Sequence, residues 1–194
     1  MDREDVRNKL FEFAYTMAFQ DATLRNAFQK WDDESEDSFH ERKKTIKTNS
    51  REYVKNYIDR VFSGNIKDSS DVLKTIEKCC NSNLGFTFGN AQKLVNMTAK
   101  YMFLSAYSEE SKRELFRYCH CPMDGVMLRK VKTEFPMFKL DSSFSWSKLE
   151  MENGAIPQYY IEFQEYIKRL AKKLEDGQVG IDLIPLEVDY ICWE

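Results

Sequence analysis

Residues 90 to 102 constrain the fold most strongly, because their apolar side chains recur with the period of an α-helix. The recurring positions are Ala91, Leu94, Val95, Thr98, Tyr101 and Met102. Just before them, Gly85 and Gly89 can adopt left-handed backbone conformations that other residues resist, which favours a tight turn bracketed by the two glycines. The sequence therefore predicts a turn followed by a helix.

The composition extends this prediction to the whole chain. Of the 194 residues, 42% are hydrophobic and 14% aromatic, with only 7 Gly and 4 Pro. This composition favours a packed helical protein over a disordered or all-β one, so we predict an all-α fold. Helices are expected at residues 2–19, 20–31, 51–63, 70–80, 158–174 and 184–193. The apolar face of the first is expected to consist of Val6, Leu10, Phe11, Phe13, Ala14, Met17 and Ala18. The basic stretch 40–50 is expected to be a loop or linker.

Two lysines share one face of the helix predicted after the turn. Lys93 and Lys100 are seven residues apart, which places their amines about two turns apart on the same side. That face also contains Asn90 and Asn96, so it need not be the apolar one. The lysine nearer the turn is expected to lie close to the positive end of the helix dipole, which favours an anion beside it.

Asp124 is predicted to begin the next helix. Pro122 biases Cys121 away from the helical region, and the apolar residues Val126, Met127, Leu128 and Val131 follow at helical spacing. An aspartate at such a position is a typical N-cap. The segment from about 119 to 132 therefore combines a proline-containing turn with a carboxylate at a helix start.

A hairpin carrying a lysine, followed by an aspartate in the form D-x-x-x-L, resembles the helix-hairpin-helix DNA glycosylase superfamily. The spacing and the additional pair Asp189 and Trp193 are most similar to the archaeal-type 8-oxoguanine DNA glycosylases, in which Lys100 also has a counterpart. The likeness covers roughly residues 84 to 194, although the Pro-Gly-x-Gly core of the hairpin is missing. It implies one two-lobed helical domain over 1–194, with a cleft between the lobes and the hairpin at about 84–103.

The resemblance also implies a chemistry on damaged double-stranded DNA. Lys93 would attack the anomeric carbon and form a Schiff base, and Asp124 would stabilise the positive charge that develops on the sugar. The enzyme would thus be a base-excision glycosylase with abasic-site lyase activity, removing an oxidised purine such as 8-oxoguanine from a flipped nucleotide.

Two further groups of residues receive expected roles. The base would be contacted by Lys100, by the backbone carbonyls of Pro122 and Met123, by Asp189 and Trp193, and by Gln20 and Trp31, which are proposed from residue type and rough location. The DNA backbone would be contacted by Gly85, Gly89 and Asn90.

The overall charge does not identify a nucleic-acid partner, because the net charge is −3. DNA binding would need a local basic surface, and three clusters offer one: Arg42 to Arg51, Arg129 to Lys132 and Lys168 to Lys173. Such clusters are usually solvated helix faces.

The five cysteines are expected to be free thiols. Cys79, Cys80, Cys119 and Cys121 lack the C-x-x-C pairs of tetrahedral zinc sites, and only Cys192 follows Asp124, so the iron–sulfur module of some superfamily members is absent. We expect no metal and no cofactor.

Other interpretations of the same residues remain open. Lys93 can be read as a surface lysine, Asp124 as a plain N-cap and Trp193 as a core anchor. The alternative function is a non-catalytic helical DNA-binding protein, or a host-defence or phage-encoded interaction protein on the same scaffold. No apolar run is long enough to span a bilayer, and no signal peptide is visible, so we expect a cytoplasmic, monomeric protein, associated with the nucleoid if it is bacterial or archaeal.

Overall fold

Helices make up the architecture of this protein. The computed structural model describes residues 3–24, 27–139, 141, 143–176 and 182–193, and within these ranges it contains no β-strand, which confirms the all-α prediction. The α-helices are α1 (Arg3–Ala22), α2 (Glu36–Phe62), α3 (Ser70–Asn81), α4 (Phe88–Phe103), α5 (Glu110–Arg113), α6 (Gly125–Glu134), α7 (Gln158–Glu175) and α8 (Pro185–Ile191), and the two 3-10 turns are η1 (Glu114–Phe116) and η2 (Trp146–Lys148).

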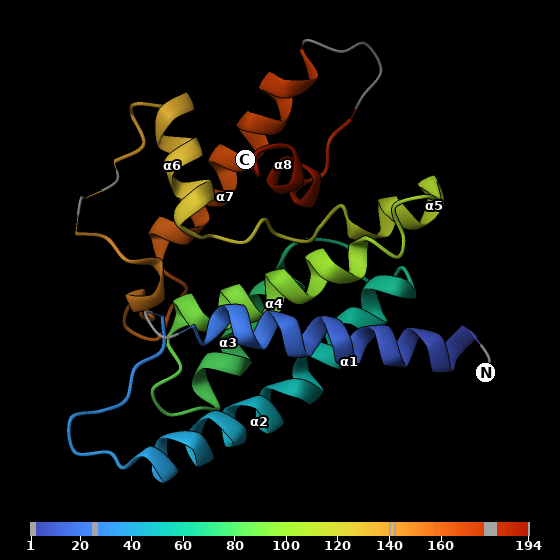
Figure 1. Ribbon diagram of the computed structural model, residues 1–194. Helices are drawn as coiled ribbons and strands as arrows, with labels where there is room; N and C mark the ends of the chain where they lie inside the picture. The colour runs from blue at the N-terminus through green and yellow to red at the C-terminus, as the bar shows by residue number, and fades with distance from the viewer. Residues whose placement is uncertain (1–2, 25–26, 140, 142, 177–181, 194) are drawn as a thin grey trace.

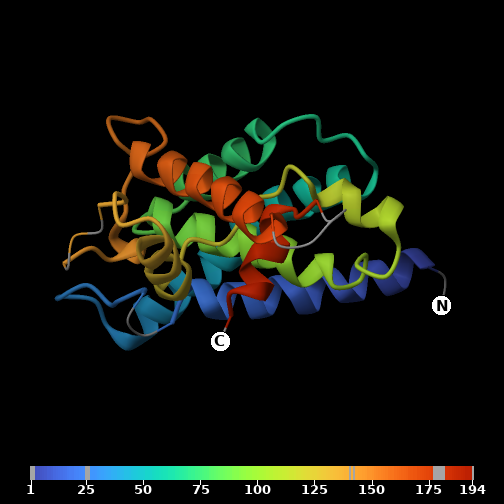
Figure 2. The same cartoon turned by 90° about the horizontal axis from the view of Figure 1, so that it is seen from above.

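The helix α4 lies at the centre of the molecule. It packs against α1, α2, α3 and η2, and every residue of α4 except Tyr101 is buried. In Figure 1, α6, α7 and α8 lie on the opposite side of α4 from α2, and Figure 2 shows α1 and α3 flanking α4. A helix surrounded in this way is shielded from water on most sides. Its polar residues therefore need hydrogen-bond partners within the protein.

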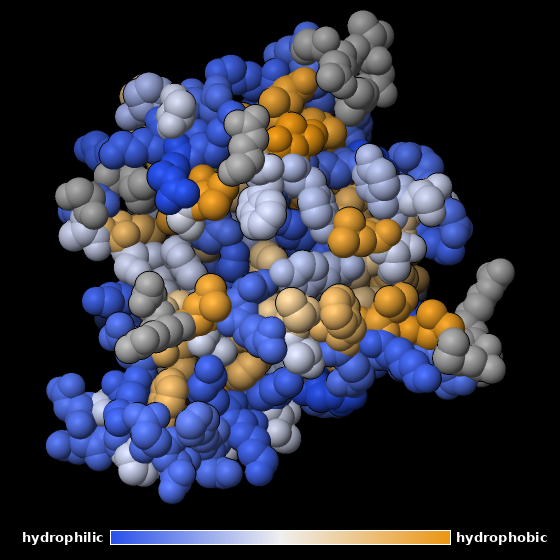
Figure 3. Space-filling view, in the orientation of Figure 1, coloured by the Kyte–Doolittle hydropathy of each residue, from blue (hydrophilic) through white to orange (hydrophobic). Residues whose placement is uncertain are grey.

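The helix α1 buries only part of the apolar face that the sequence indicated. Phe11, Ala14, Tyr15 and Ala18 are buried at helical spacing, whereas Val6, Leu10 and Phe13 are exposed. Figure 3 shows a band of more hydrophobic side chains along this helix. The prediction was right for Phe11, Ala14 and Ala18 and wrong for the three exposed residues, because α1 is apolar on more than one side and periodicity alone does not say which side meets α4.

The predicted boundary between the first helices and the basic stretch was wrong. The described residues between 23 and 35 are not helical, and α2 begins at Glu36, well before the predicted start at residue 51. The Ser35 side chain caps α2 by accepting from the Ser38 amide, and Glu36 lies in its first turn, where the helix dipole favours an acid. Residues 40–50 are therefore part of a long helix, in which Ile46 and Ser50 are buried, rather than a linker.

The turn between α3 and α4 is shorter than the sequence predicted. Gly85 has the left-handed φ of +72° that the turn needs, but Gly89 lies inside α4. Thr87 begins that helix, and its side chain accepts from the Asn90 amide at 3.0 Å. Gly89 is required instead by packing, because a Cβ there would lie 1.8 Å from the Trp146 carbonyl oxygen of η2.

The remaining helices agree with the sequence. Asp124 caps α6, Gly64 with its left-handed φ follows the end of α2, and α7 spans almost the predicted range. Pro185 occupies the first turn of α8, where its missing N–H group has no helical partner to lose.

Candidate active site

Lys93 and Asp124 form a buried ion pair between α4 and the start of α6. The Lys93 Nζ lies 2.6 Å from Asp124 Oδ2, and the two side chains are 8% and 13% exposed. The other carboxylate oxygen accepts the amides of Val126 and Met127 at 3.0 Å each. Asp124 therefore caps α6 with one oxygen and binds the lysine with the other.

Lys100 and Asp189 form a second buried pair, two turns further along α4. The Lys100 Nζ lies 2.6 Å from Asp189 Oδ2, and the side chains are 6% and 1% exposed. The other carboxylate oxygen, Oδ1, is buried and meets no hydrogen-bond donor among the described residues. The rings of Tyr190 and Trp193 lie 4.6 and 5.4 Å from the Lys100 amine, and Trp193 itself is 66% exposed.

The two ion pairs form one electrostatic cluster. The opposing effects of burial and of the lysine charge shift the pKa of the two carboxylates in different directions. Burial acts to raise the pKa of Asp124, but the charge and hydrogen bond of Lys93, with the two α6 amides, outweigh it and hold that pKa below its usual value. For Asp189, burial dominates over the attraction of Lys100 and raises the pKa. The charge of Asp124 adds to this increase, so the two carboxylates are close enough to affect each other.

Cys121 lies among these four charges but is not a candidate nucleophile. Burial first, and then the charges of Asp189 and Asp124, hold the pKa of its thiol well above the usual value. A protonated, fully buried thiol is unreactive.

A polar network holds the segment before Asp124 against α4. The Gln92 amide donates to the Met123 carbonyl at 2.8 Å, and its oxygen accepts the Met123 amide at 3.1 Å. Two residues before Met123, Gln164 of α7 makes the same two-way contact with Cys121. These paired contacts with the backbone fix the position of Asp124 relative to Lys93 along α4.

His120 anchors the start of the same segment. Its Nδ1 lies 3.0 Å from the Tyr160 hydroxyl, which accepts from Asn96 Nδ2 at 2.8 Å. Burial, with a smaller contribution from the charge of Lys168, lowers the pKa of His120 to about 3. The imidazole is therefore neutral at pH 7, and its Nδ1 shares a hydrogen bond with the Tyr160 hydroxyl.

Trp146 is an aromatic neighbour of Lys93 that the sequence did not indicate. Its ring lies 5.9 Å from the Lys93 amine, and its side chain is partly buried. The η2 turn approaches α4 closely because residue 89 has no side chain, and the Gly89 amide donates to the Leu149 carbonyl at 2.9 Å. Each lysine therefore has an indole within about 6 Å.

The other residues predicted to contact the base lie in different settings. Pro122 and Met123 are buried beside Asp124, and the Met123 carbonyl is already taken by Gln92, whereas the Pro122 carbonyl accepts only the Cys121 thiol at 3.6 Å. Gln20 is exposed in a groove with Lys43 and Lys47. Trp31 packs on Arg42, with its ring 4.0 Å from the guanidinium carbon. No contact brings Gln20 or Trp31 to the two ion pairs within the described part of the chain.

The three residues predicted to contact the DNA backbone are not equally accessible. Gly85 is exposed, with Trp31 and Arg42 beside it. The Gly89 amide donates to the Leu149 carbonyl, and the Asn90 side chain donates to the carbonyls of Ala22, at the end of α1, and Ala27. Only Gly85 thus remains open to solvent in this group.

Many of the clustered basic residues are engaged by neighbouring acids. Arg42 binds Glu34 through two nitrogens, and Arg51 binds Glu12. Lys130 and Lys173 both contact Glu134. Among the residues that the structure describes, no three His, Cys, Asp or Glu side chains group to hold a metal ion, and no helix is long and apolar enough to cross a membrane.

Sequence reasoning missed Trp146, Gln92 and the Asn96–Tyr160–His120 network. The signal available for Gln92 and Asn96 was their place on the lysine-bearing helix, one residue before and three residues after Lys93. Comparisons with protein-family models, with curated proteins and with solved structures gave no significant match for this chain. The residues of the site are therefore the basis on which a function can be proposed.

Proposed function

We propose that this protein is a DNA glycosylase with abasic-site lyase activity, acting on an oxidised purine such as 8-oxoguanine. The observation that carries the proposal is the presence of two buried lysine–aspartate pairs, two turns apart on one buried helix. Their four members come from three distant segments, and all four were singled out from the sequence.

Buried ion pairs of this kind are poorly explained by stability. Taking two charges out of water costs about as much as their attraction returns, and apolar replacements of a buried pair are often neutral or stabilising. Two such pairs on the central helix therefore support a chemical role. A lysine and a carboxylate in contact are also the groups that amine nucleophilic catalysis requires.

The first pair carries the proposed bond-making step. The Lys93 ammonium loses a proton to Asp124, and the neutral amine attacks C1′ of the damaged nucleotide while the bond from C1′ to the base breaks. The base leaves with the bonding electrons and takes up the proton that Asp124 received from Lys93. Because the pKa of Asp124 is low, its carboxylate is otherwise ionised at neutral pH and stabilises the cationic sugar.

The lyase activity follows from the same adduct. The attached amine loses one proton, and its electron pair displaces O4′ from C1′, with O4′ taking up a proton, to give a protonated imine. Removal of a C2′ proton then expels the 3′ phosphate and cleaves the strand. No metal or cofactor enters this sequence of steps.

The second pair carries the proposed recognition of the base. Asp189 Oδ1, buried and without a donor among the described residues, is suited to accept an N–H group of the base. Trp193 offers an exposed ring beside Lys100 for stacking. Of the two carbonyls beside Asp124, that of Pro122 is better suited than that of Met123 to accept the N7 hydrogen of 8-oxoguanine, since Gln92 already occupies the latter.

The proposal includes a helix-hairpin-helix motif in a two-lobed domain. The motif would be α3, the turn at Gly85 and α4, with α1 to α4 in one lobe and α6 to α8 in the other. The order of these elements, and the left-handed φ of Gly85, support this assignment. Damaged double-stranded DNA would then bind across the boundary at which the two ion pairs lie.

Borohydride trapping on DNA tests the proposal, with two matched variants. Lys93→Gln and Lys100→Gln each remove one buried ammonium from α4, so they should affect folding to a similar degree. Wild-type protein should form a reduced covalent complex with DNA containing 8-oxoguanine and with DNA containing an abasic site. Lys93→Gln should form no covalent complex with either DNA, whereas Lys100→Gln should still form one with the DNA that contains an abasic site.

The alternative function predicts a different result. A non-catalytic DNA-binding protein would bind the same duplexes without forming any covalent complex, and Lys93→Gln would at most weaken that binding. An interaction protein on this scaffold would bind neither duplex. Trapping of Lys93→Gln at the wild-type level would refute the assignment of the nucleophile.

A further inference from the structure

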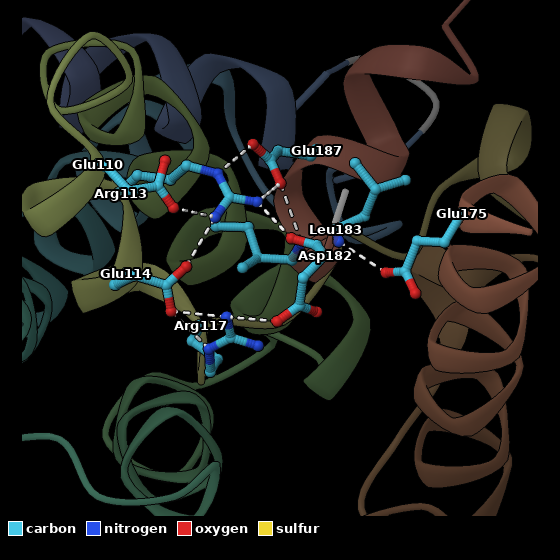
Figure 4. Close-up of polar contacts among 9 residues, drawn as sticks. Glu110, Arg113, Glu114, Arg117, Glu175, Asp182, Leu183 and Glu187 are labelled. Carbon is cyan, nitrogen blue, oxygen red and sulfur yellow. Dashed lines mark hydrogen bonds and ion pairs between the residues drawn. The ribbon is translucent and has the colours of Figure 1, made fainter. Parts of the chain in front are cut away.

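Arg113, the last residue of α5, is the centre of the densest ionic network in the described part of the chain. Its guanidinium binds Glu187 of α8 through two nitrogens, at 2.7 and 2.6 Å. The remaining nitrogen contacts Glu114 at 2.6 Å and Glu110 at 3.0 Å. Arg113 and Glu187 are 11% and 9% exposed, so this two-nitrogen pair is buried (Figure 4).

The network continues to the segment that leads into α8. Arg113 donates to the Asp182 carbonyl, and Arg117 contacts the Asp182 carboxylate at 2.8 Å and Glu114 at 2.6 Å (Figure 4). Glu187 also accepts the Ile184 amide at 2.9 Å, which caps α8. The Glu187 side chain therefore caps the N-terminus of α8 and also binds this helix to α5.

The helix α8 has two buried ionic contacts on opposite sides. Glu187 and Asp189 are two residues apart, which in an α-helix corresponds to a rotation of about 200°. Glu187 meets Arg113, and Asp189 meets Lys100. A helix of seven residues has little stability of its own, so its rotation and position depend on such contacts.

We propose that Arg113 is a positioning residue that acts through Glu187 to hold Asp189 against Lys100 and so sets recognition of the base. The inference rests on the proposed glycosylase function for its activity readout. Arg113 touches neither Lys100 nor Lys93 through any contact in the described residues, so its effect reaches the site through α8. An arginine suits this role because its planar guanidinium binds the two oxygens of Glu187 through two nitrogens in a fixed geometry, which the single ammonium of a lysine does not impose.

Two variants separate this role from general stability. Arg113→Met combined with Glu187→Gln removes both charges of the buried pair and keeps an acceptor for the Ile184 amide, so the cap of α8 is retained. Arg117→Met is the matched control, because Arg117 belongs to the same network but does not contact Glu187. Both proteins are compared as folded samples with matching circular dichroism.

The first readout compares two activities. The double variant should lose at least tenfold in kcat/KM for excision of 8-oxoguanine, mainly through KM, while cleavage at a preformed abasic site changes by less than about twofold. Arg117→Met should change neither by more than about twofold. Parallel loss of both activities in the double variant would indicate a merely structural role and overturn the inference, as would unchanged excision.

The second readout does not depend on activity. The titration of the Asp189 carboxyl is followed by carbon NMR and assigned with Asp189→Asn. Its pKa should lie above the ordinary aspartate value in the wild type and in Arg117→Met, and should fall toward that value in the double variant as Asp189 becomes solvated. An unchanged titration in the double variant would refute the positioning role. Inactivity of the wild type on both DNA substrates would refute the proposed function instead.

Discussion

Acidification should destabilise this protein through His120 before most of its carboxylates contribute. The imidazole is buried against Tyr160, and its pKa is lowered from 6.5 to about 3 by burial and by the nearby charge of Lys168. In the unfolded chain His120 takes up a proton near pH 6.5, whereas in the folded protein it stays neutral. The stabilisation is therefore complete above pH 6.5 and is lost as the pH falls toward 3.

The magnitude follows from the two pKa values. Each pH unit between them lowers the free energy of unfolding by about 1.4 kcal/mol, and the onset near pH 6.5 is gradual. Between pH 7.5 and pH 4.5 the total loss attributable to His120 is about 3 kcal/mol. Asp189 and Glu150, with raised pKa values, contribute with the opposite sign, since the folded state binds their protons more tightly.

Urea unfolding followed by circular dichroism at several pH values measures this loss. The comparison is with His120→Gln, which keeps an acceptor for the Tyr160 hydroxyl but does not titrate. Contributions from Asp189 and the other carboxylates are common to both proteins and cancel in the difference. The wild type should lose about 3 kcal/mol more of its unfolding free energy than His120→Gln between pH 7.5 and 4.5. Parallel curves over this range would refute the assignment of a buried, neutral His120.

Three further predictions concern the site. Gly89→Ala should destabilise the protein by about 2 kcal/mol in urea unfolding, because the new Cβ would lie 1.8 Å from the Trp146 carbonyl; equal or higher stability would contradict that close approach. Asp124→Asn should keep the cap of α6 and the affinity for DNA but slow single-turnover excision about 100-fold, so an unchanged rate would exclude a role for its charge. Asp189→Ala combined with Trp193→Ala should abolish excision of 8-oxoguanine while preserving cleavage at an abasic site, and equal loss of both in a folded variant would show that these residues do not read the base.

The burial of α8 determines how the roles of Asp189 and Trp193 should be tested. Leu186 and Val188 are fully buried, so removing the last residues of the chain would take apolar side chains from the core together with Asp189 and Trp193. Loss of each such side chain destabilises a protein by about 2 kcal/mol or more. Point substitutions therefore separate recognition from folding better than a truncation.

Local sequence patterns predicted the helices around the site well. The period of α4, the cap formed by Asp124 and the proline at the start of α8 all depend on interactions within a few residues, which a sequence displays directly. The pairing of Lys93 with Asp124 and of Lys100 with Asp189 was not predictable by this means. Each pair joins distant segments, and only the resemblance to a known superfamily put its members in one site.

Errors arose where distant contacts or packing decided the structure. The basic residues 40–50 looked like a linker, but Arg42 packs on Trp31 and binds Glu34, which folds the preceding loop back onto the start of α2. Gly89 looked like part of a turn, but the space that it leaves is filled by η2. Trp146 carried no local signal, since it lies in a segment without helical period and reaches Lys93 only through that packing.

The most direct test of the central claim is to locate the covalent adduct by mass spectrometry. The protein is incubated with 8-oxoguanine duplex, reduced with borohydride and digested, and the peptide that carries the sugar remnant is sequenced. We expect the adduct on Lys93, in the peptide that contains the start of α4. An adduct on Lys100 or on the N-terminal amine, or no adduct at all with DNA that the protein demonstrably binds, would contradict it.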